Sequence, residues 1–494
     1  MHPALADHLS RLRAGPGGPH IAAFFELAGT LIEPSPASDN NAPGRSSSSH
    51  RARVRIRSKR RAGTGSPADA TQLIEQQMRS WAGQTPAAVQ SQSDELFKEQ
   101  LAGSLRYDSW SLLRTHQNLG HTVVLVTETT YLQAQPWAQA LGVEHVLSTR
   151  LQTHDGVFTG TAVDDILSGV RKRVAIAEFA QSLNLNLELC HAYAHGDTEF
   201  LHTVGNPHPV NPSPREISQA RLHHWRPIYI GQRRRARGAA AAARTAAMFA
   251  CLIAAGGVGV AAGILRNDHR AGIDLATTLF GTVAPRLGRI TIAIAGEEHA
   301  RSQRPAVFFV NHQSTLVDVV VTAHVLAREF TIVVKKEVRD IPLVGCLFAL
   351  AGVAFLDKTN TAQAISALQP AVHKLQSGIS IAMSPEGTRS LTPAVGNFKK
   401  GGFHLARDAG VPIVPIVIRN AGELMWRNDK VAQPGTVDVV VHRPLPTVGW
   451  NSTDLDRWRT EIHRLYTDTL DDWPGIAAGQ HWSQLIDDAG TQRD

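Results

Sequence analysis

The stretch from Thr245 to Leu265 constrains the fold more than any other part of the chain, because it contains no charged residue. About 20 apolar residues are enough to cross the roughly 30 Å hydrocarbon core of a bilayer, so this run is a candidate membrane segment. The alternative is an Ala- and Gly-rich helix buried between two domains. Gly256 and Gly257 lie in its middle and favour a bend or a re-entrant helical pair, with Gly272–Pro285 as the second arm.

The apolar run divides a chain of 494 residues, which is too long for one small domain. Residues 20–230 and 291–450 both alternate short apolar runs with helical patterns, which is typical of α/β domains built on a parallel sheet. Residues 231–290 contain a basic cluster followed by apolar helices, and residues 451–494 are expected to form a helical tail. The sequence therefore predicts two α/β domains joined by an apolar helical membrane segment.

The formal net charge of +7 is concentrated in the basic window Arg45–Arg61. This window lies within residues 33–67, which are rich in Ser, Pro, Gly and Asn and are predicted to be a mobile insertion. A second basic cluster, Arg233–Arg237, directly precedes the apolar run. Basic residues beside an apolar segment favour anionic lipid on the cytoplasmic side. We therefore expect anionic membrane lipids as partners, the cytoplasmic face of the cell membrane as the location, and no nucleic-acid partner.

Cysteine usage and the N-terminus point to the same compartment. The three cysteines, Cys190, Cys251 and Cys346, are far apart and form no metal-ligand spacing, so a disulfide scaffold and a zinc site are not expected. Residues 1–20 are mixed and polar and lack the apolar core of a secretory signal. A reducing cytoplasm fits both observations.

A histidine and an aspartate follow a strand-like run in the second α/β region. The run Ala306–Val310 leads into His312, and Asp318 comes shortly after. In base catalysis a carboxylate fixes the imidazole tautomer while the other ring nitrogen takes a proton from a hydroxyl. Taken alone the pair is weak, because a structural histidine gives the same pattern.

Two further motifs accompany this pair. The turn Ser384–Ser390 reads S-P-E-G-T-R-S; Arg389 offers a planar fork for phosphate and Gly387 allows close backbone approach. A local ion pair between Glu386 and Arg389 is the alternative. Further along, Val411–Ile416 contains two prolines, which we expect to confine it to an edge strand or an apolar wall.

The strings N-H-Q-S, E-G-T-R-S and V-P-I-V-P stand in the order and at about the spacing of the glycerolipid acyltransferase family, which residues 290–450 resemble. This family includes the 1-acylglycerol-3-phosphate acyltransferases. The resemblance implies that His312 is the general base and Asp318 its orienting partner. It also implies a substrate phosphate site made of Lys358, Glu386, Gly387, Thr388 and Arg389. Lys358 stands where the family more often has Arg, so it keeps the charge without the bidentate fork.

The spacing of the catalytic pair departs from the family pattern. The family has four residues between His and Asp, whereas Gln313–Val317 inserts one more. On a helix, one extra residue rotates a side chain by about 100° and moves it about 1.5 Å along the axis. The pair is therefore expected to survive only if a bulge absorbs the insertion.

The resemblance implies transfer of a fatty acyl group from acyl-CoA or acyl carrier protein. The acceptor would be the free hydroxyl of 1-acyl-glycerol-3-phosphate or a related lysophospholipid, and the product phosphatidic acid. His312 would deprotonate this hydroxyl for direct attack on the thioester, so no cofactor, metal or covalent acyl-enzyme is expected.

The N-terminal region resembles the haloacid dehalogenase superfamily, and its phosphoserine phosphatase-like members in particular. The run Ala22–Leu31 reads A-A-F-F-E-L-A-G-T-L, an apolar strand entering a Gly-Thr turn. The family's first motif has a nucleophilic Asp and a second, acidic Asp at the positions of Glu26 and Ala28. The resemblance matches Thr127, Lys172 and Asp197 to the family's hydroxyl, lysine and metal-binding acid.

These replacements predict a catalytically inactive domain. Glu26 is one methylene longer than Asp, and a displacement of about 1 Å is enough to cost roughly 100-fold in rate. Ala28 donates no proton to a leaving group. We expect Lys172, Thr127 and Asp197 to bind a phosphate without hydrolysing it, and Mg²⁺ to be needed only if the domain is active.

Two other functions stay open on the sequence. One is a bifunctional enzyme whose N-terminal domain is also a Mg²⁺-dependent phosphomonoesterase. The other is a non-catalytic membrane- or nucleic-acid-binding protein, suggested by the basic window and by the irregular His–Asp spacing.

Overall fold

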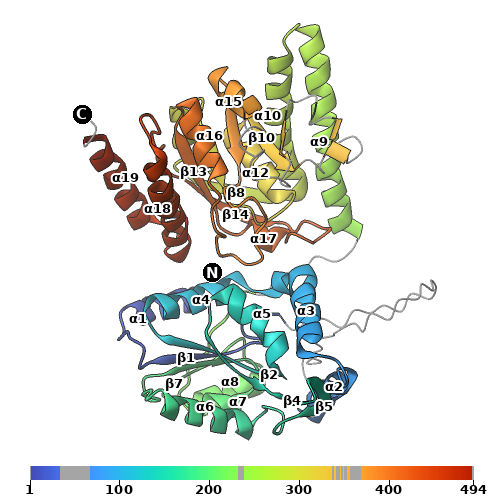
Figure 1. Ribbon diagram of the computed structural model, residues 1–494, viewed down its shortest axis with the longest axis vertical. Coiled ribbons are helices and arrows are strands. Elements are labelled where there is room, and N and C mark those ends of the chain that lie inside the picture. Colours follow the sequence, from blue (N-terminus) through green and yellow to red (C-terminus); the bar gives the residue numbers. More distant parts are fainter. Residues whose placement is uncertain are drawn as a thin grey trace, which may run out of the picture. The chain divides into compact units, whose positions relative to one another are not determined.

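The computed structural model of the chain describes residues 2–33, 67–231, 239–335 and 369–491, together with short stretches between 339 and 356. The chain divides into two compact units, residues 1–233 and 234–494 (Figure 1). Each unit has a mainly parallel β-sheet with helices packed on it, which confirms the predicted α/β fold class. Most of the predicted insertion (residues 34–66), the basic cluster at 233–237 and Lys358 lie outside the described residues.

The first unit contains a parallel sheet of five strands in the order β3-β2-β1-β6-β7. The strands are β1 (Ala22–Glu26), β2 (Thr122–Thr130), β3 (His145–Thr149), β6 (His191–Ala194) and β7 (Asn206–Pro209). A separate hairpin is formed by β4 (Leu151–His154) and β5 (Val157–Ala162). Two short apolar runs of the predicted N-terminal α/β region, Ile21–Phe25 and Thr122–Val126, fall on β1 and β2, which are neighbours in this sheet.

Helices cover both faces of the first sheet, because successive side chains of a strand point to opposite faces. Phe24 of β1 packs against Phe179 of α6, while the neighbouring Phe25 contacts His116 of α4 and Tyr193 of β6. The helices are α1 (Pro3–Arg13), α2 (Pro67–Ser80), α3 (Pro86–Leu96), α4 (Tyr107–Asn118), α5 (Tyr131–Leu141), α6 (Val170–Ser182), α7 (Thr198–Leu201) and α8 (Pro214–Leu222), with short π and 3₁₀ turns at Phe97–Leu101 and Ala102–Ser104.

The second unit contains a seven-stranded sheet in the order β11-β10-β12-β9-β13-β14-β8, in which the β13–β14 pair is antiparallel and the other pairs are parallel. The strands are β8 (Ile290–Ala295), β9 (Val307–Val310), β10 (Phe330–Lys335), β11 (Ala354–Leu356), β12 (Ser380–Met383), β13 (Ile413–Ile418) and β14 (Gly435–Val441). Because β12, β9 and β13 are parallel neighbours, their carboxyl ends meet at one edge of the sheet.

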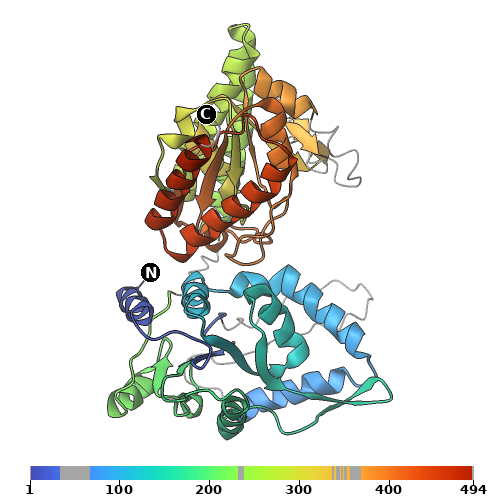
Figure 2. The same cartoon turned by 60° about the vertical axis from the view of Figure 1, so that its left-hand side comes forward.

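The helices of the second unit lie on both faces of its sheet. Phe308 and Val310 of β9 belong to the core shared with α12, whereas Phe309 packs edge-on against Phe403 of α16. Figure 2 shows α18 and α19 side by side at the end of the chain. The helices are α9 (Ala239–Leu265), α10 (His269–Gly288), α11 (His299–Ser302), α12 (Val317–Leu326), α15 (Gln369–Gln376), α16 (Gly401–Ala409), α17 (Ala421–Leu424), α18 (Ser452–Asp471) and α19 (Ile476–Thr491).

Of the two alternatives expected for Val411–Ile416, an edge strand or an apolar wall, the edge strand is wrong. β13 lies inside the sheet, between β9 and β14. Pro415 is tolerated because it lies one residue beyond the end of the β13–β14 ladder, whose pairing stops at Ile416 and Val441. Its carbonyl oxygen accepts a hydrogen bond from the backbone N–H of His442 at 2.9 Å. The missing N–H of this proline therefore falls where the ladder ends.

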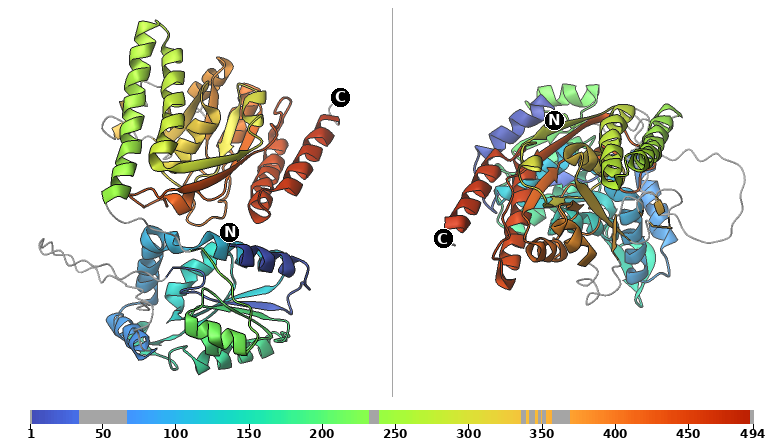
Figure 3. Two further views of the ribbon diagram at one scale, coloured as in Figure 1. Left: turned by 180° about the vertical axis from the view of Figure 1, so that it is seen from behind. Right: turned by 90° about the horizontal axis from the view of Figure 1, so that it is seen from above.

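The apolar run forms an antiparallel helical hairpin, seen from behind in Figure 3. α9 continues through Gly256 and Gly257, the chain reverses at 266–268, and α10, which contains Gly272–Pro285, is the second arm. Of the two predicted alternatives, a bend or a helical pair, the structure therefore has the helical pair. Close packing of the two helices explains why glycine stands at positions 259 and 272. A Cβ added to Gly259 would lie 2.5 Å from the carbonyl oxygen of Gly272, a distance no side chain tolerates.

α9 is long and apolar enough to cross a membrane, judged by its length and composition. Only 22% of its most apolar window is buried by the protein. Its exposed apolar side chains include Phe249, Val258, Ile264 and Leu265. The low burial leaves an apolar helix surface without cover from its own unit, as expected for a membrane segment.

Candidate active site

His312 and Asp318 form a hydrogen-bonded pair at the carboxyl end of β9. Asp318 Oδ2 lies 2.7 Å from His312 Nδ1. The Asp318 side chain is 5% exposed and that of His312 is 32% exposed. A buried carboxylate on Nδ1 favours the tautomer that carries its proton there, which leaves Nε2 as the basic nitrogen.

The loop before α12 absorbs the extra residue between the two side chains. Asp318 is the second residue of α12, whereas His312 lies outside the helix. The rotation of about 100° that one extra residue causes within a helix therefore does not separate the two side chains. Asp318 Oδ2 also accepts the backbone N–H groups of Gln313 (2.8 Å) and Ser314 (2.7 Å). The carboxylate thus holds the longer loop in a tight turn around itself.

Two amides that the sequence analysis did not single out fix this loop to β13. The Asn311 side chain donates to the carbonyl of Ile418 at 2.8 Å and accepts its N–H at 2.7 Å. The Gln313 side chain accepts the N–H of Gly422 at 3.2 Å. Both residues flank His312 in the N-H-Q-S string, which is the only sequence signal for their role.

Glu386 lies in the predicted phosphate turn, but protein groups bind both of its carboxylate oxygens. Oε1 accepts the backbone N–H of His312 at 3.0 Å. Oε2 accepts the hydroxyl of Ser390 at 2.5 Å and the N–H of Gly396 at 2.7 Å. Burial raises the pKa of this carboxyl above its usual value. Glu386 therefore links the turn to the main chain of His312. It makes no ion pair with Arg389.

The other predicted phosphate-site residues of the turn, Gly387, Thr388 and Arg389, are at least partly exposed. Gly387 has a positive φ of 68°, which favours glycine, and Thr388 is exposed. Arg389 donates through Nη1 to the hydroxyl of Thr315 and, at 2.7 Å, to the carbonyl of Arg427. Thr315 belongs to the loop that carries His312, so the structure brings the cation of the turn next to the predicted base.

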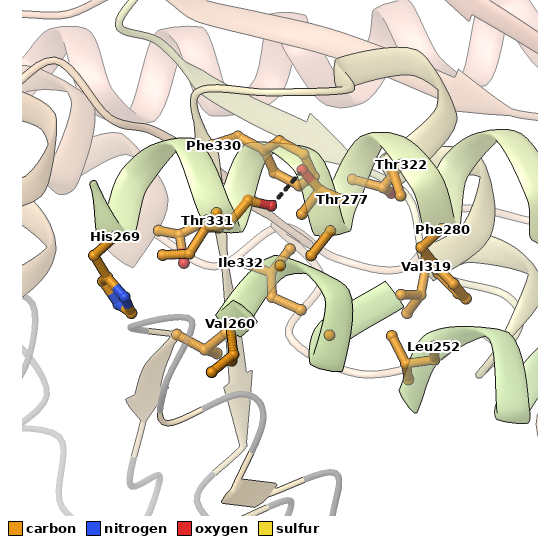
Figure 4. Close-up of a pocket in the computed structure, with 17 residues that line it drawn as sticks. Leu252, Val260, His269, Thr277, Phe280, Val319, Thr322, Phe330, Thr331 and Ile332 are labelled. Atoms are coloured by element: carbon orange, nitrogen blue, oxygen red, sulfur yellow. Dashed lines mark hydrogen bonds between the residues drawn. The ribbon is translucent and has the colours of Figure 1, made fainter. Parts of the chain in front are cut away.

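An apolar cavity of about 130 Å³ lies between the helical hairpin, α12 and β10 (Figure 4). Val319 and Thr322 of α12 line it, together with Leu252, Phe280 and Ile332. Both residues lie on the helix that also carries Asp318. The cavity is therefore bounded by this helix and by the candidate membrane segment.

The predicted N-terminal site residues also come together, around a buried lysine. Lys172 Nζ lies 2.9 Å from Glu26, 2.8 Å from Asp197 and 3.3 Å from Glu128, which the sequence analysis missed. Burial alone would lower the pKa of this ammonium, but the three carboxylates outweigh that and raise it above its usual value. Thr127 is not part of this contact set; its hydroxyl lies 3.0 Å from that of Thr129.

This arrangement suits a cation better than the phosphate expected there. Lys172 is 1% exposed and its charge is used by carboxylates, so it offers nothing to an incoming anion. Oxygens of Glu26, Glu128 and Asp197 lie within 4.8 Å of one another, and these three carboxyl groups outnumber the one ammonium of Lys172 by two. Carboxylate oxygens are the ligands that Mg²⁺ prefers, so this donor set fits that ion.

Comparisons with known proteins assign a family to each of the two units. The family model described as Acyltransferase matches residues 291–419, and the one described as haloacid dehalogenase-like hydrolase matches residues 23–199. The second unit with its His–Asp pair is thus an acyltransferase domain, and the first is a haloacid dehalogenase-like domain.

Similar sequences show to which group of acyltransferases the second unit is related. A 1-acyl-sn-glycerol-3-phosphate acyltransferase of Saccharomyces cerevisiae is 29% identical over 234 residues, 46% of this chain and 76% of that protein. A 1-acyl-sn-glycerol-3-phosphate acyltransferase alpha of Homo sapiens is 31% identical over 191 residues, 38% of this chain and 67% of that protein. The chain belongs to the 1-acyl-sn-glycerol-3-phosphate acyltransferase family and carries a haloacid dehalogenase-like domain ahead of its acyltransferase domain.

The match is partial in length. Four other curated relatives are matched over 40 to 59% of their lengths. Among solved structures, a 1-acyl-sn-glycerophosphate acyltransferase from Thermotoga maritima is 24% identical with a TM-score of 0.41, and the alignment covers 47% of this chain and 95% of that one.

Proposed function

We propose that this chain transfers a fatty acyl group from acyl-CoA, or acyl carrier protein, to the free hydroxyl of 1-acyl-glycerol-3-phosphate or a related lysophospholipid. The product is phosphatidic acid when the acceptor is lysophosphatidic acid. The observation that carries the proposal is the 2.7 Å contact between His312 and Asp318 beside the Arg389 turn.

The reaction needs one base and no covalent intermediate on the protein. His312 Nε2 takes the proton of the acceptor hydroxyl, whose oxygen attacks the thioester carbonyl carbon. The new C–O bond forms, the C–S bond breaks, and the proton on His312 passes to the leaving thiolate. Asp318 stabilises the imidazolium between these steps, because its buried carboxylate remains bound to Nδ1.

The surroundings of the pair support a lipid substrate. The apolar cavity beside α12 offers space for part of a fatty chain, and the helical hairpin that bounds it exposes apolar side chains to a bilayer. We place the enzyme at the cytoplasmic face of the cell membrane, where acyl-CoA is available.

The first unit has the ligands for Mg²⁺ but not the groups for hydrolysis. Glu26, Glu128 and Asp197 would hold the ion, whose charge would bind a phosphate oxygen. Glu26 is fixed on both oxygens, by Lys172 and by the N–H of His195 at 3.1 Å, and Ala28 supplies no acid. We propose a structural or regulatory domain; Mg²⁺-dependent release of phosphate from phosphomonoesters would instead establish the bifunctional alternative.

An assay with labelled acyl-CoA and lysophosphatidic acid tests the main proposal. The full chain in detergent is expected to form phosphatidic acid, and His312→Ala to reduce kcat by about 100-fold or more, since a positioned base contributes 10²–10⁴-fold. His481→Ala, at an exposed position on α19, is the matched control and should keep full activity. Equal rates for His312→Ala and the unchanged chain would refute the assignment of the base.

A further inference from the structure

Two arginines from different loops are held against each other beside the predicted base. Arg389 Nη1 donates to the carbonyl of Arg427 at 2.7 Å, and Arg427 Nη1 donates to the carbonyl of Arg389 at 3.2 Å. These reciprocal bonds bring two guanidinium groups together, although like charges repel. Within the described part of the chain, neither arginine has an ion pair with a carboxylate.

The arginine pair has a hydrogen-bond donor that an anion could accept. Arg427 Nε is buried and has no hydrogen-bond partner among the described residues. Buried donors are rarely left unpaired in native proteins, and such exceptions call for a physical explanation. Burial, together with the charge of Arg427, lowers the pKa of the Arg389 guanidinium. An anion between the two side chains would relieve both the repulsion and the unpaired donor.

The position of Arg427 is fixed by its neighbours. The indole of Trp426 donates to the carbonyl of Leu391 at 3.3 Å, which ties this loop to the turn that carries Arg389. Further along the loop, the N–H of Ala432 donates to the hydroxyl of Thr245 on α9 at 2.9 Å. The loop therefore joins the turn to the helical hairpin, and Arg427 is placed before any substrate arrives.

The arginine pair is also joined to the loop that carries His312. The hydroxyl of Thr315 contacts both Arg389 Nη1 and the carbonyl of Arg427, and the N–H of Ser390 donates to the carbonyl of His312 at 2.7 Å. In a glycerol-3-phosphate acceptor, only two carbons and one oxygen separate the sn-2 hydroxyl from the phosphorus. A phosphate at the arginine pair would thus leave that hydroxyl close to the base.

We propose that Arg427, together with Arg389, forms a binding site for a phosphate monoester beside His312. This proposal rests on the proposed acyltransferase function and adds a residue outside the motifs that define the family resemblance. Two guanidinium forks suit a phosphate monoester dianion, whose charge and oxygens match both. The acceptor headgroup and the 3′-phosphate of CoA both have this chemistry.

Steady-state kinetics of the full chain separate the two sources. Arg427→Gln is expected to raise the KM for one phosphate-bearing substrate by about 10- to 100-fold, the range for hydrogen bonds to charged groups. A rise for lysophosphatidic acid assigns the site to the acceptor headgroup; a rise for acyl-CoA assigns it to CoA. Arg427→Lys should raise the same KM by less than Arg427→Gln does, because lysine keeps the positive charge but lacks the bidentate fork. Arg443→Gln, an exposed arginine paired with Asp487, is the control.

Binding of glycerol 3-phosphate gives a readout that does not depend on turnover. It is expected to raise the Tm of the unchanged chain and of Arg443→Gln but not of Arg427→Gln. If the unchanged chain shows this shift yet transfers no acyl group, the proposed function fails and the phosphate site stands. If Arg427→Gln keeps both KM values and the Tm shift, the proposed site is wrong. Circular dichroism of each variant separates loss of binding from loss of folding.

Discussion

At the residue scale, the orientation of His312 depends on two buried carboxylates, those of Asp318 and Glu386. Asp318 binds the ring nitrogen and two backbone N–H groups of the following loop. Glu386 binds the backbone N–H of His312 itself. The base is therefore held from its ring and from its main chain, and a rigid base is what a direct attack on a thioester requires.

A substitution at Glu386 tests the main-chain part of this support. In Glu386→Gln an amide NH₂ replaces one oxygen and meets an N–H or hydroxyl donor. Leaving buried donors unsatisfied costs about 1–3 kcal/mol, so we expect that loss in the free energy of unfolding, together with a lower kcat. Denaturant unfolding and the acyl-transfer assay measure the two effects.

Glu298→Gln is the control for Glu386→Gln, because Glu298 is 75% exposed in the same unit. We expect it to change neither stability nor kcat. If Glu386→Gln behaved like this control, Glu386 would not support the base.

At the scale of elements, the α9–α10 hairpin exposes its most apolar side chains near the turn between its helices. Ile264 is 75% exposed and Leu265 is 86% exposed. Figure 1 shows both helices extending beyond the sheet of their own unit. Fully burying such a side chain is worth about 1.5–3 kcal/mol, so this tip would contribute strongly to insertion into a bilayer.

The double substitution Ile264→Glu and Leu265→Glu tests this insertion. It removes the apolar surface and adds two charges, so we expect at least about a tenfold loss of binding to anionic lipid vesicles in a flotation assay. Ile476→Glu is the matched control, since Ile476 is a 67% exposed apolar residue on α19 of the same unit. Unchanged flotation of the double variant, or an equal loss in the control, would rule out the hairpin tip as the anchor.

The sequence predicted those elements whose signal is local. The apolar run Ala306–Val310 predicted β9, because buried parallel strands are continuous in their apolarity. The position of β13 inside the sheet was not predictable, since it depends on where the β14 ladder ends relative to Pro415. The place where the chain reverses, at 266–268, was also not predicted, because Gly256 and Gly257 stay helical where α9 packs against α10, despite their low helix propensity.

The residues of the candidate site could be predicted where they belong to a recognisable sequence motif. His312, Asp318 and the turn with Arg389 could be named from their strings. The survival of the His–Asp pair depended on a loop that only the structure shows, and Lys358 lies outside the described residues. Arg427 and Glu128 come from segments with no motif and join their sites only through the fold.

At the scale of the whole molecule, the two units differ in how their cores are built. The first unit has a buried histidine cluster between its sheet and α1 and α4, made of His8, His116, His121, His191 and His208 around Tyr193. The Tyr193 hydroxyl lies 2.9 Å from His8 Nε2 and 2.7 Å from His116 Nε2. Burial lowers the pKa of His8 to about 4, where Arg11 and Arg226 add to the effect, and that of His191 to about 3.

This cluster should make the first unit sensitive to acid. Its histidines are neutral in the folded chain, whereas in the unfolded chain they take up protons near pH 6.5. The unfolded state therefore binds more protons as the pH falls from about 6.5 towards about 4. The free energy of unfolding should decrease over that window by roughly 1.4 kcal/mol per pH unit for each histidine that stays neutral.

Calorimetry of the full chain between pH 7.5 and 5 measures this loss. We expect two transitions, with the Tm of the first unit falling more steeply as the pH decreases. Among the described residues of the second unit, His442 is the one buried histidine, and burial lowers its pKa to about 4. His191→Phe keeps an aromatic ring but removes one titrating group, so it should flatten the steep transition and leave the other unchanged. Two transitions with equal slopes, or a steep one untouched by His191→Phe, would show that the cluster does not control acid stability.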